Sequence, residues 1–270
     1  MTLINQLIND NNVDAVYIAT PPNSNKFYSL KVAQAGKPCC IEKPLATNYK
    51  DSLEIYNTFK EKKLPLFVSY YRRCLPRFNQ IKTILDENTF GKIIHVNWQF
   101  SKPPNKIDLS KKYNWRTDPE VAPNGYFDDL ASHGLDLFTY LLGKIIEAKG
   151  FSLNQLNLYK AKDTFTACWL HENGITGSGH WNFGCAQYKD KVIISGSKDE
   201  IIFSIFKDNP ILLEINGTTK EYNIKNPKHI QLHHVKSIKN QLFNKIMHPS
   251  NAKTALHTSC VMDQITGNLI

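Results

Sequence analysis

The stretch VDAVYIATPP at residues 13–22 decides the fold class, because a short apolar run of β-branched and aromatic residues leads directly into a proline-rich turn. Similar apolar runs recur at 38–42 and 64–70, and helical stretches at 24–35 and about 48–62 separate them. Strands that alternate with helices and are apolar on both faces are typical of a parallel sheet covered on both sides. The beginning of the chain is therefore predicted to be α/β, with a doubly wound parallel sheet.

The pattern changes after about residue 90. Apolar and polar residues alternate between Ile93 and Phe100, as expected for a strand that is buried on one face only. Further strands are predicted at 164–170, 175–183, 192–196, 201–206, 211–215 and 221–224, and helical segments at 230–247 and 251–265. We therefore predict two domains: residues 1–75 with the parallel sheet, and residues 76–270 as an α+β domain with a large, mostly antiparallel sheet.

Composition excludes several classes of protein. No apolar run approaches the roughly 18 residues of a membrane-spanning helix, and no secretory leader is visible, so no membrane partner is expected. Only four of the 33 basic residues are arginines, and the lysines are scattered, which disfavours nucleic-acid binding. The six cysteines form no C-x-x-C pair, which favours reduced thiols and a cytoplasmic location.

Two predicted strand ends carry reactive groups. In open parallel sheets, ligands bind beyond the carboxyl ends of the strands. One such end reads Thr20-Pro21-Pro22-Asn23, and the other reads Glu42-Lys43-Pro44, which places a carboxylate and an ammonium in one crevice. Taken alone, this Glu–Lys pair favours an ordinary surface ion pair over a reactive site.

A second constellation lies on a helix predicted to begin at about Phe127. Asp129, His133, Asp136 and Tyr140 follow one another at spacings of four, three and four residues, which predicts one polar row. A carboxylate beside an imidazole orients it and raises its pKa, an arrangement suited to general acid–base catalysis. A plain surface Asp–His pair remains the alternative.

The remaining histidines suggest a weaker hypothesis. His229, His233 and His234 form a loose cluster, and the first two are spaced to share one helix face. They are the only basis for a metal-dependent hydrolase. Because no carboxylate or cysteine lies at ligand spacing nearby, no metal site is expected.

Taken in order, these pieces resemble the Gfo/Idh/MocA family of nicotinamide-dependent oxidoreductases. The likeness spans almost the whole chain, and its matching stretches are 13–22, 36–44, 71–73 with 76–78, 115–116 and 125–143. The resemblance implies NAD or NADP as cofactor and reversible oxidation of a small sugar, inositol or related diol. It also implies a homo-oligomer, since the open face of the family's large sheet commonly forms a dimer.

The resemblance further implies roles for particular residues. Lys43 is similar to the family's catalytic lysine, His133 to its proton-transfer residue, and Asp129 to the partner that orients the substrate. Tyr126 joins these three as a substrate-binding position. The implied cofactor-binding positions are Thr20, Pro21, Asn23, Glu42, Lys43, Arg72 and Arg116.

This sequence departs from the family pattern at its beginning. The family starts with a strand, a G-x-G-x-x-G/A loop and a helix that hold the pyrophosphate, whereas the only G-x-G here is Gly177-Ser178-Gly179. We therefore expect an N-terminally truncated form with a partial Rossmann sheet and impaired cofactor binding. The alternative is a non-catalytic remnant that retains the sheet domain for dimerisation or carbohydrate binding. A lesser departure is Asn124, where the family usually has glycine.

Overall fold

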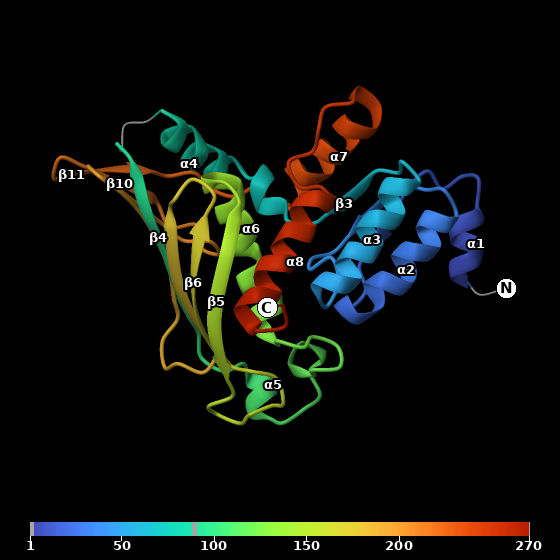
Figure 1. Cartoon of the computed structure of the whole chain (residues 1–270), viewed down its shortest axis with the longest axis horizontal. Helices are drawn as coiled ribbons and strands as arrows, with labels where there is room; N and C mark the ends of the chain where they lie inside the picture. Colours follow the sequence, from blue (N-terminus) through green and yellow to red (C-terminus); the bar gives the residue numbers. More distant parts are fainter. Residues whose placement is uncertain (1–2, 88–90, 270) are drawn as a thin grey trace.

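The computed structural model describes residues 3–87 and 91–269, which form two separate β-sheets (Figure 1). The first sheet is parallel, with the strand order β1-β2-β3, as predicted. Its three strands alternate with three helices along the chain. In chain order, the elements are α1 (Leu3–Asn9), β1 (Val16–Ile18), α2 (Pro22–Gln34), β2 (Cys39–Ile41), α3 (Tyr49–Glu61) and β3 (Leu66–Val68).

Burial explains why these short runs become strands. Every residue of β2 and β3 is buried, and β1 buries Val16 and Ile18. Helices α2 and α3 pack on one face of the sheet. Helix α7 (Leu232–Asn244) reaches the other face, where Nε2 of His234 lies 3.7 Å from Sγ of Cys40. This second face is less well covered at β1, since Tyr17 remains 45% exposed.

The second sheet has eight strands in the order β11-β10-β9-β8-β4-β7-β6-β5. Neighbouring strands are antiparallel except β4 and β7, so the sheet is mostly antiparallel, as predicted. Strand β5 was absent from the sequence-based prediction. The bounds are β4 (Ile93–Ser101), β5 (Ile145–Leu153), β6 (Thr164–His171), β7 (Thr176–Asn182), β8 (Lys189–Gly196), β9 (Glu200–Phe203), β10 (Ile211–Ile215) and β11 (Thr218–Tyr222).

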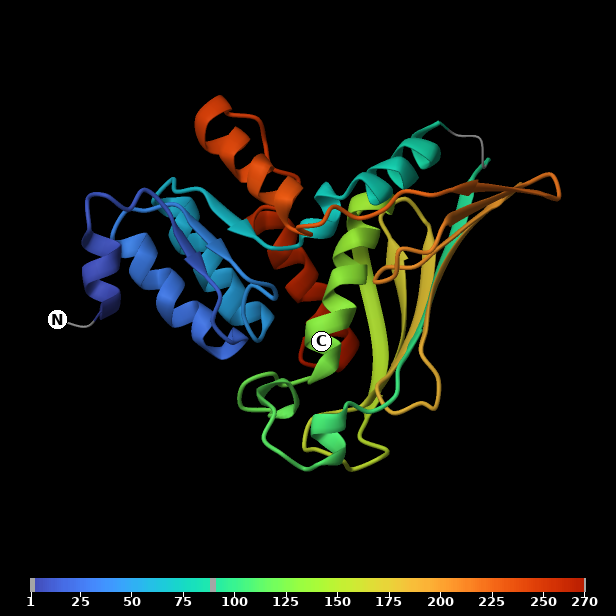
Figure 2. The ribbon, with the colours of Figure 1, turned by 180° about the vertical axis from the view of Figure 1, so that it is seen from behind.

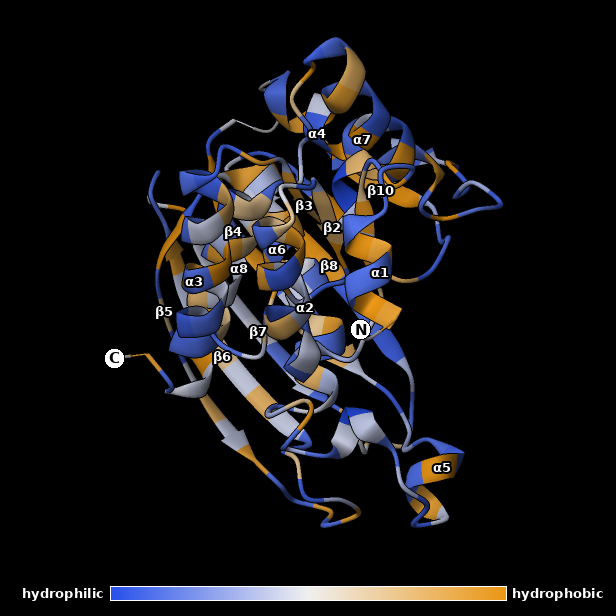
Figure 3. Ribbon diagram, turned by 90° about the vertical axis from the view of Figure 1, so that its right-hand side faces the viewer, coloured by the Kyte–Doolittle hydropathy of each residue, from blue (hydrophilic) through white to orange (hydrophobic). Residues whose placement is uncertain are grey.

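Two helices cover one face of the large sheet: α6 (Ser132–Leu142) and α8 (Ala252–Thr266) (Figure 2). Helix α8 also packs against α3, and its Asp263 accepts a hydrogen bond from the backbone N–H of Tyr49 at 2.8 Å. Because α8 contacts elements of both sheets, it holds the two parts of the molecule together. The hydropathy colouring shows polar outer faces on α2 and α3 over apolar strands (Figure 3).

The segment before α6 differs from the single α-helix predicted from Phe127. Residues Phe127–Ala131 form a π-helical turn, η3, and the α-helix begins only at Ser132. A π-turn contains more residues per turn than an α-helix, so side chains four residues apart across it no longer share one face. This change of period decides the geometry of the site.

The connecting segments contain four further short elements. They are η1 (Tyr71–Cys74), α4 (Pro76–Asp86), α5 (Lys106–Leu109) and η2 (Trp115–Thr117). Within the described residues, every helix is too short or too polar to span a lipid bilayer.

Candidate functional site

The carboxyl ends of β1 and β2 are joined by Asn25, a residue that sequence reasoning missed. Its side chain is 1% exposed and donates to the carbonyl oxygens of Glu42 and Pro44, at 3.3 and 3.0 Å. Thr20 donates to its amide oxygen at 3.2 Å. Asn25 therefore fixes the backbone on both sides of Lys43. Its position three residues into a helix gave no signal that could have singled it out.

Lys43 reaches from this strand end to the π-turn of the other part of the molecule. Its Nζ donates to the main-chain oxygen of Asp129 at 2.5 Å and forms an ion pair with the Asp129 carboxylate. Arg116 donates to the second carboxylate oxygen at 3.3 Å. Burial raises the pKa of Asp129, but the charges and hydrogen bonds of Lys43 and Arg116 outweigh it and hold the pKa below its ordinary value.

The expected carboxylate–imidazole pair between Asp129 and His133 is wrong. The Asp129 carboxylate pairs with the two cations instead, because the π-turn rotates it away from the face that His133 occupies. The His133 ring is 5% exposed and lies edge-on against aromatic rings, those of Tyr70, Tyr71 and Phe206.

The surroundings of His133 also reverse the expected shift of its pKa. Burial, and then the positive charges of Arg72 and Lys43, lower this pKa well below its ordinary value. The imidazole is therefore neutral at physiological pH. Its Nδ1 is buried and has no hydrogen-bond partner among the described residues. Since the Lys43 charge acts on the ring, the two predicted catalytic side chains lie within electrostatic reach of each other.

Arg72 packs among the aromatic rings that surround His133, rather than at the strand ends. Its guanidinium lies over the rings of Tyr71 and Phe206, at 4.9 and 4.6 Å from their centroids, and its Nε donates to the carbonyl of Ile205 at 3.2 Å. Its Nη1 is buried without a partner among the described residues. Whether a cofactor contacts Arg72 stays a prediction.

A polar cavity of about 350 Å³ lies beside Asp129 and Arg116. Tyr126 belongs to its wall, and its hydroxyl donates to the buried carboxylate of Asp108 at 2.6 Å. The role of Tyr126 in substrate binding stays a prediction. The same hydroxyl accepts hydrogen bonds from the amides of Asn105 and Asn114. The complete lining is Lys102, Asn105, Ile107, Asn114, Arg116, Tyr126, Asp129 and Leu130.

Most of this lining was missed by sequence reasoning. Lys102, Asn105, Ile107 and Asn114 come from the segment after β4, which includes the short helix α5. Neither a period nor a motif marks them in the sequence. The one available signal was that polar residues recur in the stretch just before Trp115 and Arg116.

The Glu42 side chain points away from Lys43, to the face of the small sheet where Tyr17 and Gln231 lie. Its carboxylate accepts hydrogen bonds from the Tyr17 hydroxyl at 2.5 Å and from the Gln231 amide at 3.0 Å. Burial and the bond to Glu42 raise the pKa of Tyr17. The sequence therefore places Glu42 next to Lys43, but the alternation of a strand end sends the two side chains in different directions.

Thr20, Pro21 and Asn23 lie at the carboxyl end of β1, as predicted. Pro21 and Asn23 are exposed, and Asn23 donates to the main-chain oxygen of Glu120 at 3.4 Å. The segment between η2 and η3 thus contacts this strand end through Glu120. The role of Thr20, Pro21 and Asn23 in cofactor binding stays a prediction.

The histidine cluster differs from the expected one. His229 is exposed and His233 half-buried, and neither joins a group of metal-ligand atoms in the part of the chain that the structure describes. His234 lies instead beside Cys74 and His248, all three buried. Both ring nitrogens of His248 bond to backbone groups, those of His234 and Ser250, which indicates a structural role in anchoring the C-terminal segment.

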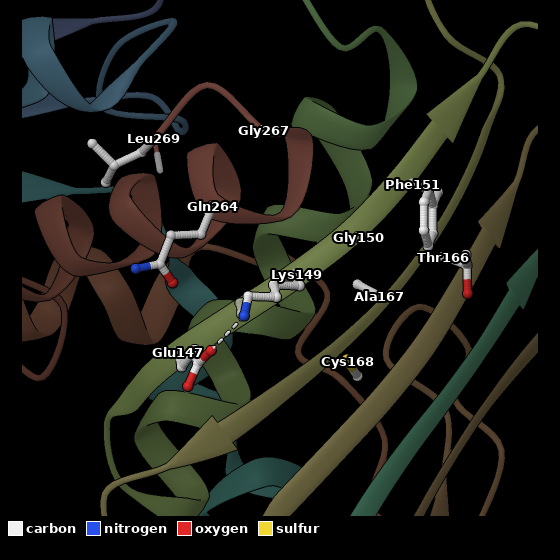
Figure 4. A pocket seen from close by; sticks show the side chains of 11 residues that line it. Glu147, Lys149, Gly150, Phe151, Thr166, Ala167, Cys168, Gln264, Gly267 and Leu269 are labelled. Atoms are coloured by element: carbon white, nitrogen blue, oxygen red, sulfur yellow. Dashed lines mark ion pairs between the residues drawn. The ribbon is translucent and has the colours of Figure 1, made fainter.

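A larger hollow of about 720 Å³ lies away from these residues, on β5 and β6 beside the end of α8 (Figure 4). Phe151, which is 77% exposed, and the exposed ion pair between Glu147 and Lys149 line it. None of the predicted catalytic or cofactor-binding residues belongs to this hollow. It therefore offers no acid–base pair for the predicted chemistry.

Two family models match the chain. The model described as an oxidoreductase family with an NAD-binding Rossmann fold covers residues 1–70, and the model of the GFO/IDH/MocA C-terminal domain covers residues 78–202. The boundary between the two matches falls in the segment that holds η1 and the start of α4.

Individual proteins agree with these models. Oxidoreductase P35 from Formosa agariphila is 32% identical over 97% of this chain and 81% of its own length. Myo-inositol 2-dehydrogenase from Thermotoga maritima is 26% identical over 77% of this chain and 61% of its own length.

Among solved structures, levoglucosan dehydrogenase in complex with NADH and levoglucosan superimposes with a TM-score of 0.85 at 18% identity. The superposition covers 97% of this chain and 79% of the dehydrogenase, and at that identity it supports the fold. The two family models and the match to P35 together establish that this chain belongs to the Gfo/Idh/MocA family of oxidoreductases.

Proposed function

We propose that this protein transfers a hydride between a nicotinamide cofactor and a carbon that bears a hydroxyl or keto group in a sugar, inositol or related polyol. The observation that carries the proposal is the ion pair between Lys43 and Asp129, a residue of the cavity wall, with the buried His133 within electrostatic reach of Lys43. Names of relatives support the substrate class, since one is a myo-inositol dehydrogenase and one structural neighbour contains levoglucosan.

The described residues fit the nicotinamide end of such a cofactor. Thr20 and Asn23 offer a hydroxyl and an amide at the carboxyl end of β1, where ligands of open parallel sheets bind. Nη1 of Arg72 and Nδ1 of His133 are buried polar atoms without a partner among the described residues. We infer that residues 1–75 hold the cofactor and that residues 76–270 hold the substrate.

The pyrophosphate has no comparable cradle in the described residues. Gly177 and Gly179 lie in β7, where a Cβ on either would collide with an indole ring, that of Trp169 or Trp181. These glycines make room for aromatic side chains. Helix α2 begins with Pro22, which offers no N–H to an anion.

The chemistry assigned to the chain's own residues is proton transfer and charge stabilisation. When bound, the nicotinamide supplies or accepts the hydride. Lys43, whose ammonium pairs with Asp129 of the cavity wall, stabilises negative charge that develops on the substrate oxygen. His133 is neutral and therefore able to accept the hydroxyl proton. Asp129 positions Lys43 through two hydrogen bonds.

We further propose that copies of the chain associate through the open face of the large sheet, which α6 and α8 leave uncovered (Figure 1). Exposed apolar side chains support this, among them Phe151 and Leu153 on β5. Sedimentation of the wild type and of Phe151→Asp tests it: the wild type is expected as a dimer and the variant as a monomer. All six cysteines are free thiols, which supports the proposed cytoplasmic location.

The experiment that tests the activity measures the reduction of NAD⁺ and NADP⁺ at 340 nm with a panel of hexoses, hexuronic acids and inositols. Turnover is expected with at least one of them, together with quenching of tryptophan fluorescence by NADH. Lys43→Met is expected to lower kcat by about a thousandfold.

Lys50→Met is the matched control, because Lys50 lies exposed on α3 and loses the same charge. Its kcat is expected to stay within twofold of wild type. Absence of NADH quenching and of turnover with every compound would reject the proposal and favour a non-catalytic sugar-binding or dimerisation role.

A further inference from the structure

The cavity beside Asp129 contains more cationic than anionic groups. Lys102 and Arg116 line it, and the Lys43 ammonium pairs with the same Asp129 carboxylate as Arg116. Asp129 is the single carboxylate in the lining, and it already pairs with both Lys43 and Arg116. Lys102 has no ion-pair partner among the described residues.

Lys102 is nevertheless held in a defined position. Its Nζ donates to the side-chain oxygen of Asn105 at 2.6 Å and lies 4.7 Å from the centroid of the Tyr126 ring. Asn105 is itself fixed by its hydrogen bond to the Tyr126 hydroxyl. One hydrogen bond leaves two of the three ammonium donors of Lys102 without a partner in the described structure.

The neighbouring acid does not satisfy this charge. The buried Asp108 carboxylate accepts hydrogen bonds from Tyr126 and Asn114, and it forms no ion pair with Lys102. Burial lowers the pKa of Lys102, against the opposing charges of Asp108 and Asp129. A partly desolvated ammonium with unused donors gains from an anion at hydrogen-bond distance.

We propose that this cavity binds an oxyanion substituent of the substrate, with Lys102 and the free guanidinium donors of Arg116 as its partners. The inference rests on the proposed function, because it specifies the substrate class of the same site. A cavity of about 350 Å³ accommodates a ligand the size of a monosaccharide. The substrate is thus an anionic sugar or polyol, such as a sugar acid or a sugar phosphate, rather than a neutral one.

Binding of matched sugars tests the proposal without requiring turnover. The probes are D-glucuronate against D-glucose and D-galacturonate against D-galactose, with D-glucose 6-phosphate as the phosphate arm, titrated into the protein by calorimetry in the presence of NADH. At least one anionic sugar is expected to bind tenfold or more tightly than its neutral counterpart. Preference for the uronates or for the phosphate identifies which oxyanion the cavity accepts.

Two variants connect the preference to Lys102. Lys102→Gln is expected to weaken binding of the anionic sugar about tenfold and to change binding of the neutral sugar less than twofold. Lys106→Gln removes the same charge from an exposed position four residues along and is expected to change neither. Equal affinities within every pair, no binding of any anionic sugar, or an equal loss for both sugars in Lys102→Gln would overturn the proposal.

Turnover separates this inference from the proposed function. Oxidation of neutral and anionic sugars at equal kcat/KM would reject the oxyanion site and leave the oxidoreductase intact. Tight, Lys102-dependent binding of an anionic sugar without turnover of any compound would support the oxyanion site and reject the proposed activity.

Discussion

The ammonium of Lys43 donates to both the carboxylate and the main-chain oxygen of Asp129, although the two residues lie 86 positions apart in the sequence. Lys43 follows a strand of the small parallel sheet, and Asp129 lies in the π-turn that leads into α6. The contact therefore joins the cofactor side and the substrate side of the proposed site. Its side chains are 10% and 30% exposed, so water screens it only in part.

The first prediction is that Lys43 and Asp129 act as one unit. Lys43→Met and Asp129→Asn are each expected to lower kcat/KM by two to three orders of magnitude, since either change removes the positioned ammonium. The double variant is expected to be no more than about tenfold worse than the poorer single variant. Steady-state kinetics of the four proteins measure this, and fully additive losses would show that the two residues act independently.

The second prediction concerns the protonation of His133. Burial and two nearby cations lower its pKa well below the ordinary value of 6.5. Its imidazole resonances are therefore expected to stay at their neutral positions between pH about 8 and 5 in a ¹⁵N–¹H NMR titration. A midpoint for His133 at or above its ordinary value of 6.5 would contradict the assignment.

A third prediction follows from the buried histidines of the C-terminal segment. Burial lowers the pKa of His248 to about 4 and that of His234 to about 3. Because the unfolded chain binds protons below pH about 6.5 and the folded chain does not, the free energy of unfolding falls as pH decreases through this window. Through His248 alone, the free energy of unfolding is expected to be about 2–3 kcal/mol lower at pH about 4 than at pH about 8.

Urea unfolding at several pH values measures this dependence. His248→Gln is expected to be less stable than wild type at pH about 8, because the backbone bonds of the imidazole are lost. It is also expected to lose less stability on acidification, since one titrating group is absent. An unchanged slope between pH about 6.5 and 4 would rule out His248 as a source of acid sensitivity.

A fourth prediction concerns the buried ion pair between Arg73 and Asp136. Two nitrogens of the guanidinium bond to the carboxylate, at 2.7 and 2.8 Å, and Thr258 of α8 donates to the same carboxylate. Arg73→Met is expected to lower the free energy of unfolding by about 3–5 kcal/mol, because it leaves a buried charge unpaired. Chemical denaturation measures the change.

The exposed pair between Lys82 and Asp86 provides the control for this prediction. Lys82→Met is expected to change the free energy of unfolding by less than about 0.5 kcal/mol. The double variant Arg73→Met with Asp136→Leu is expected to recover part of the lost stability. A double variant with a lower free energy of unfolding than Arg73→Met would show that the pair stabilises the fold beyond satisfying its own charges.

Local patterns were sufficient for the parallel sheet and for every strand of the large sheet except β5, because burial on one or both faces of a strand leaves a period in the sequence. They were insufficient for the Asp129–His133 relationship. The π-turn depends on contacts that are distant in sequence, such as the stacking of Phe127 on Phe165 and the bond from Lys43. Spacing alone therefore assumed a regular helix and paired the wrong side chains.

The lining of the polar cavity could not be predicted from local sequence patterns either. Its polar lining comes from an irregular segment whose positions are fixed by Asp108, Asn114 and Tyr126 acting together. No residue of that network is distinctive by itself. The histidine cluster was wrong for a similar reason: the partners of His234 are Cys74 and His248, which only the packing of α7 against η1 brings near.

The last prediction concerns Gly134, which allows α6 to approach the large sheet. A Cβ at this position would lie 2.2 Å from the Trp98 ring, and neither partner has free space, since Trp98 is fully buried. Gly134→Ala is therefore expected to lower the free energy of unfolding by about 1–3 kcal/mol, despite the higher helix propensity of alanine. Because His133 precedes this residue, displacement of α6 is also expected to lower kcat more than it raises KM.

Replacing the Trp98 indole with a smaller side chain separates this steric explanation from a general loss of helix stability. Trp98→Leu alone leaves a cavity and is expected to destabilise the protein, whereas Gly134→Ala places a methyl group into that cavity. The double variant is consequently expected to be more stable than the sum of the single changes predicts, by about 1 kcal/mol or more. Additive losses would mean that the methyl group and the indole do not compete for the same space, and that another constraint fixes the distance between α6 and β4.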